Sequence, residues 1–365
     1  MRALRIALLL ALVIPAATGV VACTSSGGNS SSSDSSGEIA ASSSAVSFVV
    51  AGTTTYATLQ VPAHRTGQKL AAALLLAGSG PTDRNGNQLT SGVTPYTLQV
   101  VADTLAKQGI MSLRFDKYFS GKTGGGRFAQ DVGSITAQDF LDQAVAAYTY
   151  LSTQPLADPS KLLVLGHSEG GKYALSVAGS VSRKPAGLGL LEPADQRLLD
   201  VFRIQVDEKL NALVAQGALT HAQAISNAGV IVTAIEHFRT GQSVDLTGLV
   251  AALRPSVAQM LVTSPDLNFT RTEDRLDPVI FARAVQSGTR VLVTDGTRDS
   301  QIPPSTIGPL IDALHAAGTT GPGLQLIQDI DHDMHLPSQP ATQAVLAPAV
   351  VTAIQQWAEP FASTP

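Results

Sequence analysis

The chain has 365 residues and a formal net charge of −4, and charged residues make up only 14% of it, against about 25% in a typical soluble protein. No basic excess is present that could bind nucleic acid, and nothing in the charge balance calls for an acidic partner. The length fits one α/β domain with an insertion, because such folds often run beyond about 250 residues as one unit.

The first residues have the pattern of an export signal. Arg2 and Arg5 precede an apolar run over residues 6–21, which closes at Val20-Val21-Ala22-Cys23. This tetrapeptide resembles a bacterial lipobox, and the alternative is an ordinary secretory signal with an incidental cysteine. We predict a lipoprotein signal peptide over residues 1–22 and a lipid anchor at Cys23 that holds the protein at the extracytoplasmic face of the cell membrane. Cys23 is the only cysteine, which excludes an intramolecular disulfide.

Residues 24–44 consist mostly of Ser and Gly and contain almost no large apolar side chain. Such a segment cannot bury enough surface to offset its chain entropy. We therefore predict a Ser/Gly-rich tether over residues 23–45 and a folded part that begins near Ala45.

Residues 46–193 read as the first part of an α/β core. Alternating residues at its start predict a β-hairpin, and the apolar run over residues 69–77 predicts a strand that is covered on both faces. The predicted strands are 46–51, 54–61, 69–77 and 110–115, and the predicted helices are 97–108 and 137–153. The triplet 121–123 (Gly-Lys-Thr) lacks the glycine that a Walker loop requires at position 116, where Asp116 stands, so no nucleotide cofactor is expected.

A strand that ends at Leu165 runs into the pentapeptide 166–170 (Gly-His-Ser-Glu-Gly) and then into a helix of small residues. This is the G-x-S-x-G nucleophile elbow, in which a strained turn exposes a serine hydroxyl above the end of a strand. Glycines flank the serine because strand and helix approach too closely for a Cβ. We interpret Ser168 as a nucleophile; the alternative is a tight turn with a structural role only.

The Gly-rich loop over residues 78–87 follows the strand 69–77. In hydrolases with a nucleophile elbow, the loop at this position supplies one of the two donors of the oxyanion hole. We predict that the main-chain N–H of Ser79 is the donor there, with Gly80 as the next choice. The second donor would be the N–H of Glu169, directly after the nucleophile. A surface turn is the alternative for the loop.

After a strand over residues 186–191, the β–α alternation stops. Apolar residues recur at helical spacing over residues 194–276 with no strand between them, which predicts a helical cap; the alternative is extra scaffold without a gating role. The core resumes over residues 277–365. Its predicted helices are 278–285, 307–317 and 345–361, and its predicted strands are 289–294 and 323–328.

A serine hydroxyl needs a histidine to accept its proton and a carboxylate to fix the histidine tautomer. Three histidines lie beyond Asp299: His315 falls within a predicted helix, His332 follows the last strand by four positions, and His335 comes one helical turn later. We predict His332 as the base, with His335 as the fallback.

The D-G-x-x-D pattern that ends at Asp299 follows a strand and precedes His332 by 33 positions, so Asp299 is the predicted acid. Glu192, after the sixth strand, is the alternative. The acidic residues 329, 331 and 333 with the nearby histidines match neither an EF-hand nor a zincin, and we predict no metal site.

Four motifs carry a family resemblance: the loop 78–86, the elbow 166–170, the acid loop 295–299 and the pair Asp331-His332. Together they resemble a bacterial branch of the α/β-hydrolase superfamily, the serine esterases near the serine aminopeptidases. The resemblance implies a mostly parallel central sheet flanked by helices, with a helical cap inserted after the sixth strand. It also implies a Ser168, Asp299 and His332 triad. The loop after Asp116 departs from the family form R-G-x-G-x-S.

The expected function is therefore that of a serine esterase tethered to the cell envelope, which cleaves small-molecule carboxylic esters through an acyl-enzyme intermediate. A peptidase or amidase with the same triad is one alternative. A ligand-binding lipoprotein on a hydrolase scaffold, without turnover, is the other.

Overall fold

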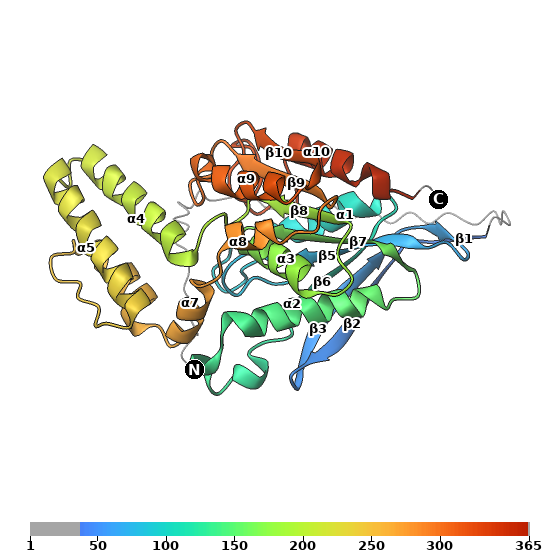
Figure 1. Ribbon diagram of the computed structural model, residues 1–365, viewed down its shortest axis with the longest axis horizontal. Coiled ribbons are helices and arrows are strands. Elements are labelled where there is room, and N and C mark those ends of the chain that lie inside the picture. Colours follow the sequence, from blue (N-terminus) through green and yellow to red (C-terminus); the bar gives the residue numbers. More distant parts are fainter. Residues whose placement is uncertain (1–36, 364–365) are drawn as a thin grey trace, which may run out of the picture.

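The computed structural model describes residues 37–363, so the predicted signal peptide and Cys23 lie outside the described residues. An eight-stranded sheet forms the centre, in the order β10-β9-β8-β7-β5-β6-β3-β2 (Figure 1). Its strands are β2 (Ser42–Val50), β3 (Thr53–Val61), β5 (Leu70–Leu76), β6 (Met111–Phe115), β7 (Ala157–His167), β8 (Gly187–Leu191), β9 (Arg290–Gly296) and β10 (Thr320–Ile327). The pairs β2–β3 and β3–β6 are antiparallel, and the other pairs are parallel. The predicted hairpin and the mostly parallel sheet are confirmed.

Helices cover both faces of this sheet. Residues of α2 (Ala137–Ser152), α3 (Glu169–Ser180), α8 (Pro278–Arg283) and α9 (Gly308–Ala316) pack on one face, and residues of α1 (Thr97–Ala106) and α10 (Pro348–Ala358) pack on the other. The short 3-10 helices are Gly126–Phe128, Val132–Ser134, Pro304–Thr306 and Glu359–Phe361.

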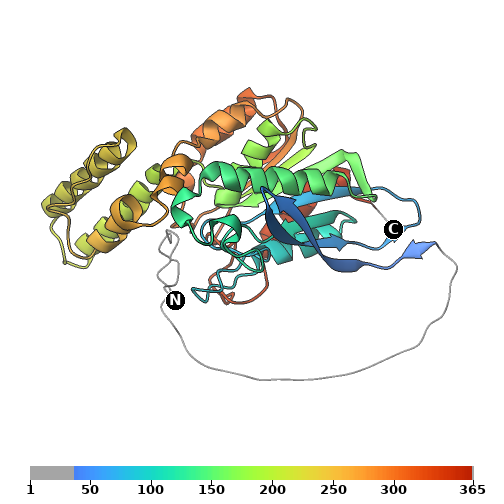
Figure 2. The same ribbon diagram turned by 90° about the horizontal axis from the view of Figure 1, so that it is seen from below.

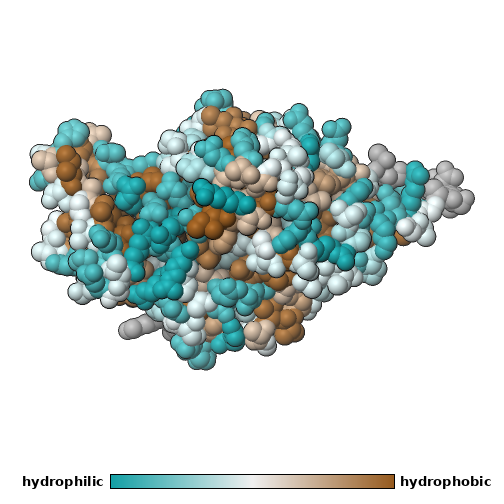
Figure 3. All heavy atoms as spheres, viewed as in Figure 1, coloured by the Kyte–Doolittle hydropathy of each residue, from teal (hydrophilic) through white to brown (hydrophobic). Residues whose placement is uncertain are grey.

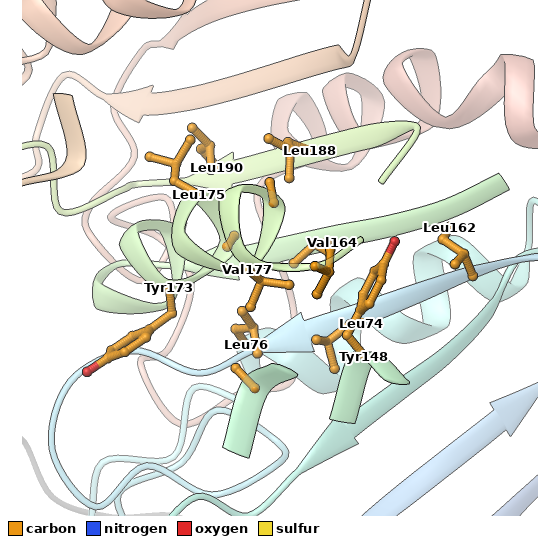
Figure 4. Close-up of a cluster of buried hydrophobic side chains, with 14 of the residues drawn as sticks. Leu74, Leu76, Tyr148, Leu162, Val164, Tyr173, Leu175, Val177, Leu188 and Leu190 are labelled. Atoms are coloured by element: carbon orange, nitrogen blue, oxygen red, sulfur yellow. The ribbon is translucent and has the colours of Figure 1, made fainter. Parts of the chain in front are cut away.

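The central strands are apolar throughout because successive side chains enter opposite layers. In β5, Leu74 and Leu76 contact the α2–α3 layer, whereas Leu75 contacts the α1–α10 layer. Figure 4 shows Leu74 and Leu76 together with Tyr173 and Val177 of α3 in the first layer. Each such leucine contributes roughly 1.5–3 kcal/mol on burial, and this packing fixes the ends of the strands on which the site depends.

The folded part begins earlier than predicted. Strand β2 starts at Ser42, which pairs with Val61 of β3, and β1 (Glu38–Ile39) pairs with β4 (His64–Arg65). Main-chain hydrogen bonds hold these strands, and they do not require apolar side chains. The prediction of a tether over residues 23–45 is therefore wrong for its last eight residues, and its first part lies outside the described residues.

The predicted helical insertion after the sixth strand of the sheet is confirmed. It consists of α4 (Leu198–Ala215), α5 (His221–Thr240), α6 (Arg254–Ala258), a π-helical turn (Gln259–Thr263) and α7 (Leu267–Glu273), and residues 192–289, all of them described, contain no strand. The α4–α5 hairpin extends away from the sheet in both ribbon views (Figures 1 and 2). It packs on its own apolar cluster, which includes Phe202, Ile231, Phe238 and Val257.

The two ends of the cap are joined at Asp274. The Arg197 guanidinium, just before α4, donates from Nε to the Asp274 carbonyl at 2.6 Å. Arg239 of α5 donates from Nε to the Asp274 carboxylate at 2.8 Å, and the main-chain N–H of Leu199 donates to it at 2.9 Å. Asp274 is buried, so it closes the base of the cap with charge-assisted hydrogen bonds.

A second contact joins the cap to α3, the helix that follows Ser168. Lys172 Nζ lies 2.6 Å from Glu273 Oε1 of α7, and the Tyr173 hydroxyl donates to Glu273 Oε2 at 2.6 Å. The side chains of Lys172 and Glu273 are 2% and 0% exposed. An ion pair this deeply buried tolerates the loss of neither partner alone.

The surface mixes hydrophilic and hydrophobic residues, and the hydrophobic ones form separate patches on the face seen in Figure 3. On α5, Ile225 and Val232 are among the exposed large apolar residues. Within residues 37–363, no helix combines the length and the apolar character that crossing a bilayer requires.

Candidate active site

Ser168 stands at the sharp turn between β7 and α3. Its backbone has φ 55° and ψ −125°, a strained conformation for a residue with a side chain, of the kind that costs of order 1–3 kcal/mol and persists only where the surroundings impose it. A Cβ on Gly166 would overlap the Gly170 carbonyl, and a Cβ on Gly170 would overlap the carbonyl of Leu76. The two glycines therefore allow the close approach of strand and helix that the G-x-S-x-G pattern predicts.

The structure brings together the three side chains predicted as a triad. His332 Nε2 lies 2.8 Å from Ser168 Oγ, and His332 Nδ1 lies 2.6 Å from Asp299 Oδ2. The second carboxylate oxygen of Asp299 accepts from the main-chain N–H of Gln301 at 2.7 Å and of Ile302 at 2.9 Å. The three residues follow β7, β9 and β10, whose carboxyl ends meet at one edge of the sheet.

The other candidate residues lie elsewhere. His315 is exposed on α9, and His335 is buried, with no hydrogen-bond partner for its ring nitrogens among the described residues. Asp331 Oδ1 accepts from the main-chain N–H of Asp333 and His335. The Asp331 side chain therefore closes its own loop, as short acidic side chains often do.

Burial and the Asp299–His332 pair set the electrostatics of the site. Burial alone would lower the pKa of His332, but attraction to Asp299 and the hydrogen bond between them outweigh it and raise the pKa to about 9. Burial would raise the pKa of Asp299, but His332 and the N–H donors of Ile302 and Gln301 lower it. The Asp299 carboxylate therefore stays charged and stabilises a proton on His332.

Both predicted oxyanion donors lie beside Ser168. Ser79 lines the same cleft as Ser168, and among the described residues its main-chain N–H has no acceptor. Its carbonyl accepts from Thr82 Oγ1 at 2.6 Å and from Gln88 Nε2 at 3.1 Å, which fixes the loop. Glu169 is the first residue of α3, where a main-chain N–H has no intrahelical acceptor.

The cleft and the solvent at its open mouth together occupy about 640 Å³. The loop after β5 forms one wall, and His167, Gln301 and Asp333 add polar groups near the triad. Gln205 of α4 donates to the Gln301 carbonyl at 3.0 Å. The cap therefore contacts the acid loop directly, through Gln301, which lines the cleft.

Glu192, the alternative acid, lies behind Asp299 and has no hydrogen bond to His332. One carboxylate oxygen each of Glu192, Asp295 and Asp299 lie within 4.8 Å of one another, and Glu192 accepts from the Gly296 N–H at 2.7 Å. Burial, reinforced by the neighbouring carboxylates, raises the pKa of Glu192 and raises that of Asp295 to about 7. Three carboxylates at this spacing could surround a cation. In the absence of a cation, burial favours the protonated forms of Glu192 and Asp295, whereas Asp299 stays charged beside His332.

The sequence did not indicate two supporting residues. His167 Nε2 lies 2.8 Å from the His332 carbonyl. Burial lowers the pKa of His167 to about 4, so the neutral ring donates this hydrogen bond. The bond connects the elbow to the loop that carries His332. Lys117 binds the Gly78 carbonyl and lies 3.1 Å from Glu169 Oε2. Lys117, at the start of the loop after Asp116, therefore also holds the Gly-rich loop over residues 78–87 in place.

No family model and no curated protein matches the chain, but several solved structures are similar to it. Est1E from Butyrivibrio proteoclasticus with bound ferulic acid has a TM-score of 0.53 and 16% identity, over 86% of this chain and 97% of that one. An esterase of Pyrococcus furiosus, Pf2001, has a TM-score of 0.50 and 12% identity, over 88% and 94%.

An acylaminoacyl peptidase in complex with Z-Gly-Gly-Phe-chloromethyl ketone has a TM-score of 0.54 and 13% identity, over 88% of this chain but only 41% of that one. At identities this low, the similarity bears on the fold alone. The structural similarity, the sheet order and the inserted cap together show that the chain has the α/β-hydrolase fold, as predicted.

Proposed function

We propose that this protein is a serine hydrolase that cleaves carboxylic esters of small molecules through an acyl-enzyme intermediate. The observation that carries the proposal is the continuous hydrogen-bonded chain from Ser168 Oγ through His332 to Asp299, with distances of 2.8 and 2.6 Å. It begins at a strained elbow, and stored strain of this kind concentrates at functional sites. A protein that only bound a ligand would need none of these features.

In the first half-reaction, neutral His332 donates from Nδ1 to Asp299 and accepts the Ser168 hydroxyl proton at Nε2 as Oγ attacks the ester carbonyl. The carbonyl oxygen becomes an oxyanion, which the N–H groups of Ser79 and Glu169 stabilise. Loss of one such donor typically costs about 3 kcal/mol of barrier. His332 then passes the proton to the leaving alcohol, and the acyl group stays on Ser168.

In the second half-reaction, a water molecule replaces the alcohol. His332 accepts a proton from this water as its oxygen attacks the acyl carbon, and the same two N–H groups stabilise the second oxyanion. The carboxylic acid leaves when His332 returns the proton to Ser168 Oγ. Throughout, Asp299 holds the imidazole in the tautomer that presents a free Nε2 to Ser168.

Cleavage of amides would use the same residues. The ester is favoured because this chain covers 94% of the Pyrococcus furiosus esterase Pf2001 and 97% of Est1E with bound ferulic acid, but only 41% of the acylaminoacyl peptidase. The ferulic acid bound to Est1E makes feruloyl esters a sensible addition to a panel of short acyl esters.

The test is labelling of the purified full-length protein with a fluorophosphonate, in the wild type, Ser168→Ala and His332→Ala. We expect labelling of the wild type only, and turnover of p-nitrophenyl esters faster than of peptide anilides. Circular dichroism of each variant verifies that it is folded. A folded wild type that is neither labelled nor active would contradict the proposal and favour the ligand-binding alternative.

We also propose that a lipid at Cys23 tethers the enzyme to the outer face of the cytoplasmic membrane. The support is the sequence Val20-Val21-Ala22-Cys23 after an apolar segment. In bacterial cells expressing the protein, Cys23→Ala should abolish incorporation of radiolabelled palmitate and release the enzyme from the membrane fraction. Equal incorporation by wild type and variant would argue for the ordinary secretory signal.

A further inference from the structure

Lys117 is a buried cation that the proposed mechanism leaves without a role. It lies two residues after the end of β6, and its side chain is only 10% exposed. The ammonium group binds the Gly78 carbonyl and lies 3.1 Å from Glu169 Oε2. Around it are the apolar side chains of Leu76, Phe115 and Phe140, which line a small cavity with Lys117. In such surroundings a lysine needs partners, because an unpaired buried charge is costly.

The two partners of Lys117 belong to the two segments that supply the oxyanion donors. The Gly78 carbonyl and the Ser79 N–H are opposite ends of one peptide group, which is planar, so fixing the oxygen also fixes the direction of the N–H. Glu169 supplies the second donor from its main chain and binds Lys117 with its side chain. One ammonium group thus connects two loops that are 91 residues apart in the sequence (169 − 78).

We propose that Lys117 is a positioning residue for the oxyanion hole: it aligns the Ser79 and Glu169 donors and strengthens the Ser79 donor. This inference rests on the proposed function. A cation at a carbonyl oxygen polarises the peptide group, and hydrogen bonds in series strengthen one another where the dielectric is low. The Glu169 carboxylate balances the charge, so the ammonium is retained in the interior.

Lys117 acts through other groups and not on the substrate. It is absent from the lining of the cleft that contains Ser168 and His332, and its described contacts are the Gly78 carbonyl, the Glu169 carboxylate and the face of Phe140, whose centroid lies 5.8 Å from Nζ. A positioning role of this kind predicts a loss in kcat with little change in KM, because the oxyanion exists only after attack.

The test compares Lys117→Met, the double variant Lys117→Met/Glu169→Gln, and Lys117→Arg. Lys117→Met keeps the approximate length of the side chain but removes the charge and the donor. We expect kcat to fall about 100-fold, in line with the loss of an oxyanion donor, and KM to change less than threefold. Lys117→Arg, which keeps a cation, should recover part of the rate.

The double variant separates positioning from a structural role. It removes both charges, so no unpaired carboxylate stays buried, and it should fold even if Lys117→Met does not. We expect its kcat to stay about 100-fold low, because the Gly78 carbonyl has lost its donor. Lys172→Met is the matched control. It also removes a buried, paired lysine, here within α3, but one that contacts no oxyanion donor, and the kcat of the folded protein should stay within threefold of wild type.

A phenylboronic acid probes the oxyanion hole directly, since its adduct with Ser168 places a negative oxygen there. Its affinity should fall in the double variant by about the factor lost in kcat. Wild-type rates in Lys117→Met or in the double variant, with boronate affinity unchanged, would overturn the inference while leaving the proposed function intact. Absence of turnover and of fluorophosphonate labelling in the wild type would overturn both.

Discussion

The catalytic core and the cap both contain buried charged groups, but they use them differently. In the core, His332 lies between Ser168 and Asp299 and can exchange a proton with its neighbours. At the junction of core and cap, Lys172 of α3 and Glu273 of α7 form an ion pair, and at the base of the cap Asp274 binds Arg197 and Arg239. These groups join the cap to the core and its two ends to each other, and none of them has a hydrogen bond to Ser168.

The charged groups of the core and of the cap differ because different parts of the structure hold them in place. Strand ends fix the core residues, and packing on both faces of the sheet holds those ends. The cap has no sheet, and its helices pack mainly on one another, so its attachment to the core depends on a few ion pairs. Changes in the core network should therefore appear mainly in rate, and changes in the cap network mainly in stability.

The largest expected effect is on the core. Asp299→Asn removes the charge that stabilises the His332 proton and holds its tautomer, so kcat for p-nitrophenyl acetate should fall about 10⁴-fold. Glu192→Gln, the matched change at the alternative acid, should cost less than about tenfold, because Glu192 has no bond to His332. A larger loss in Glu192→Gln than in Asp299→Asn would assign the role to Glu192.

The same pair of variants should differ in pH dependence. The pKa of wild-type His332 is raised to about 9, and His332 must be neutral to accept the serine proton. Activity is therefore expected to fall as the pH decreases below that value. Without the Asp299 charge the pKa of His332 drops, so the acid limb of kcat/KM in Asp299→Asn should move to lower pH. An unmoved limb would mean that another group controls it.

The second effect concerns the cap. Lys172→Met leaves the fully buried Glu273 carboxylate without its cation, which should cost about 3–5 kcal/mol of unfolding free energy. Burial already raises the pKa of Glu273 and Lys172 opposes this rise, so the variant carboxyl will bind a proton more readily. A raised folded-state pKa contributes stability at low pH that is lost as the pH rises, and the loss should be greater at pH 8 than at pH 5.

Urea unfolding at both pH values measures this effect, and Lys172→Met/Glu273→Gln is the control that removes both charges. We expect the double variant to recover part of the stability and to lose the pH dependence of the single variant. If Lys172→Met were equally destabilised at pH 5 and pH 8, the buried carboxylate would not be the cause.

The smallest effect is a gain in stability near the junction of core and cap. Asp195 is buried, and burial raises its pKa from 3.8 to about 6. Its contribution to stability is present below about pH 4 and is lost as the pH rises through 6. Because Asn does not ionise, Asp195→Asn should raise the unfolding free energy at pH 8 by up to about 3 kcal/mol and leave it unchanged at pH 4. Thermal melts at the two pH values would detect the difference, and an equal gain at both would show that charge is not involved.

Much of the core could be predicted from sequence because its signals are local. Apolar runs such as residues 69–77 mark buried strands, and the elbow at Ser168 marks the strand-to-helix turn. The early strands at Glu38 and Ser42 could not be predicted in this way, since main-chain pairing in a Ser-rich segment leaves no apolar pattern.

The predicted triad residues were found because each follows a strand, and parallel strands bring their ends together. Lys117 and His167 gave no such signal. Lys117 lies 52 residues from Glu169 in the sequence, and its neighbour Asp116 opens a loop without a recognisable pattern. Contacts between loops depend on tertiary packing, which spacing along one sequence does not encode.

The closure of the cap base at Asp274 has a consequence for how this fold can change. Because Arg197 and Asp274 are already joined by a 2.6 Å hydrogen bond, the chain leaves and re-enters the core at almost the same point. An exchange of residues 198–272 for another helical hairpin, which keeps Glu273 as the partner of Lys172, would leave the ends of β8 and β9 where they are. Recombination at these positions is therefore expected to alter the surroundings of the acid loop while the Ser168, His332 and Asp299 geometry is retained.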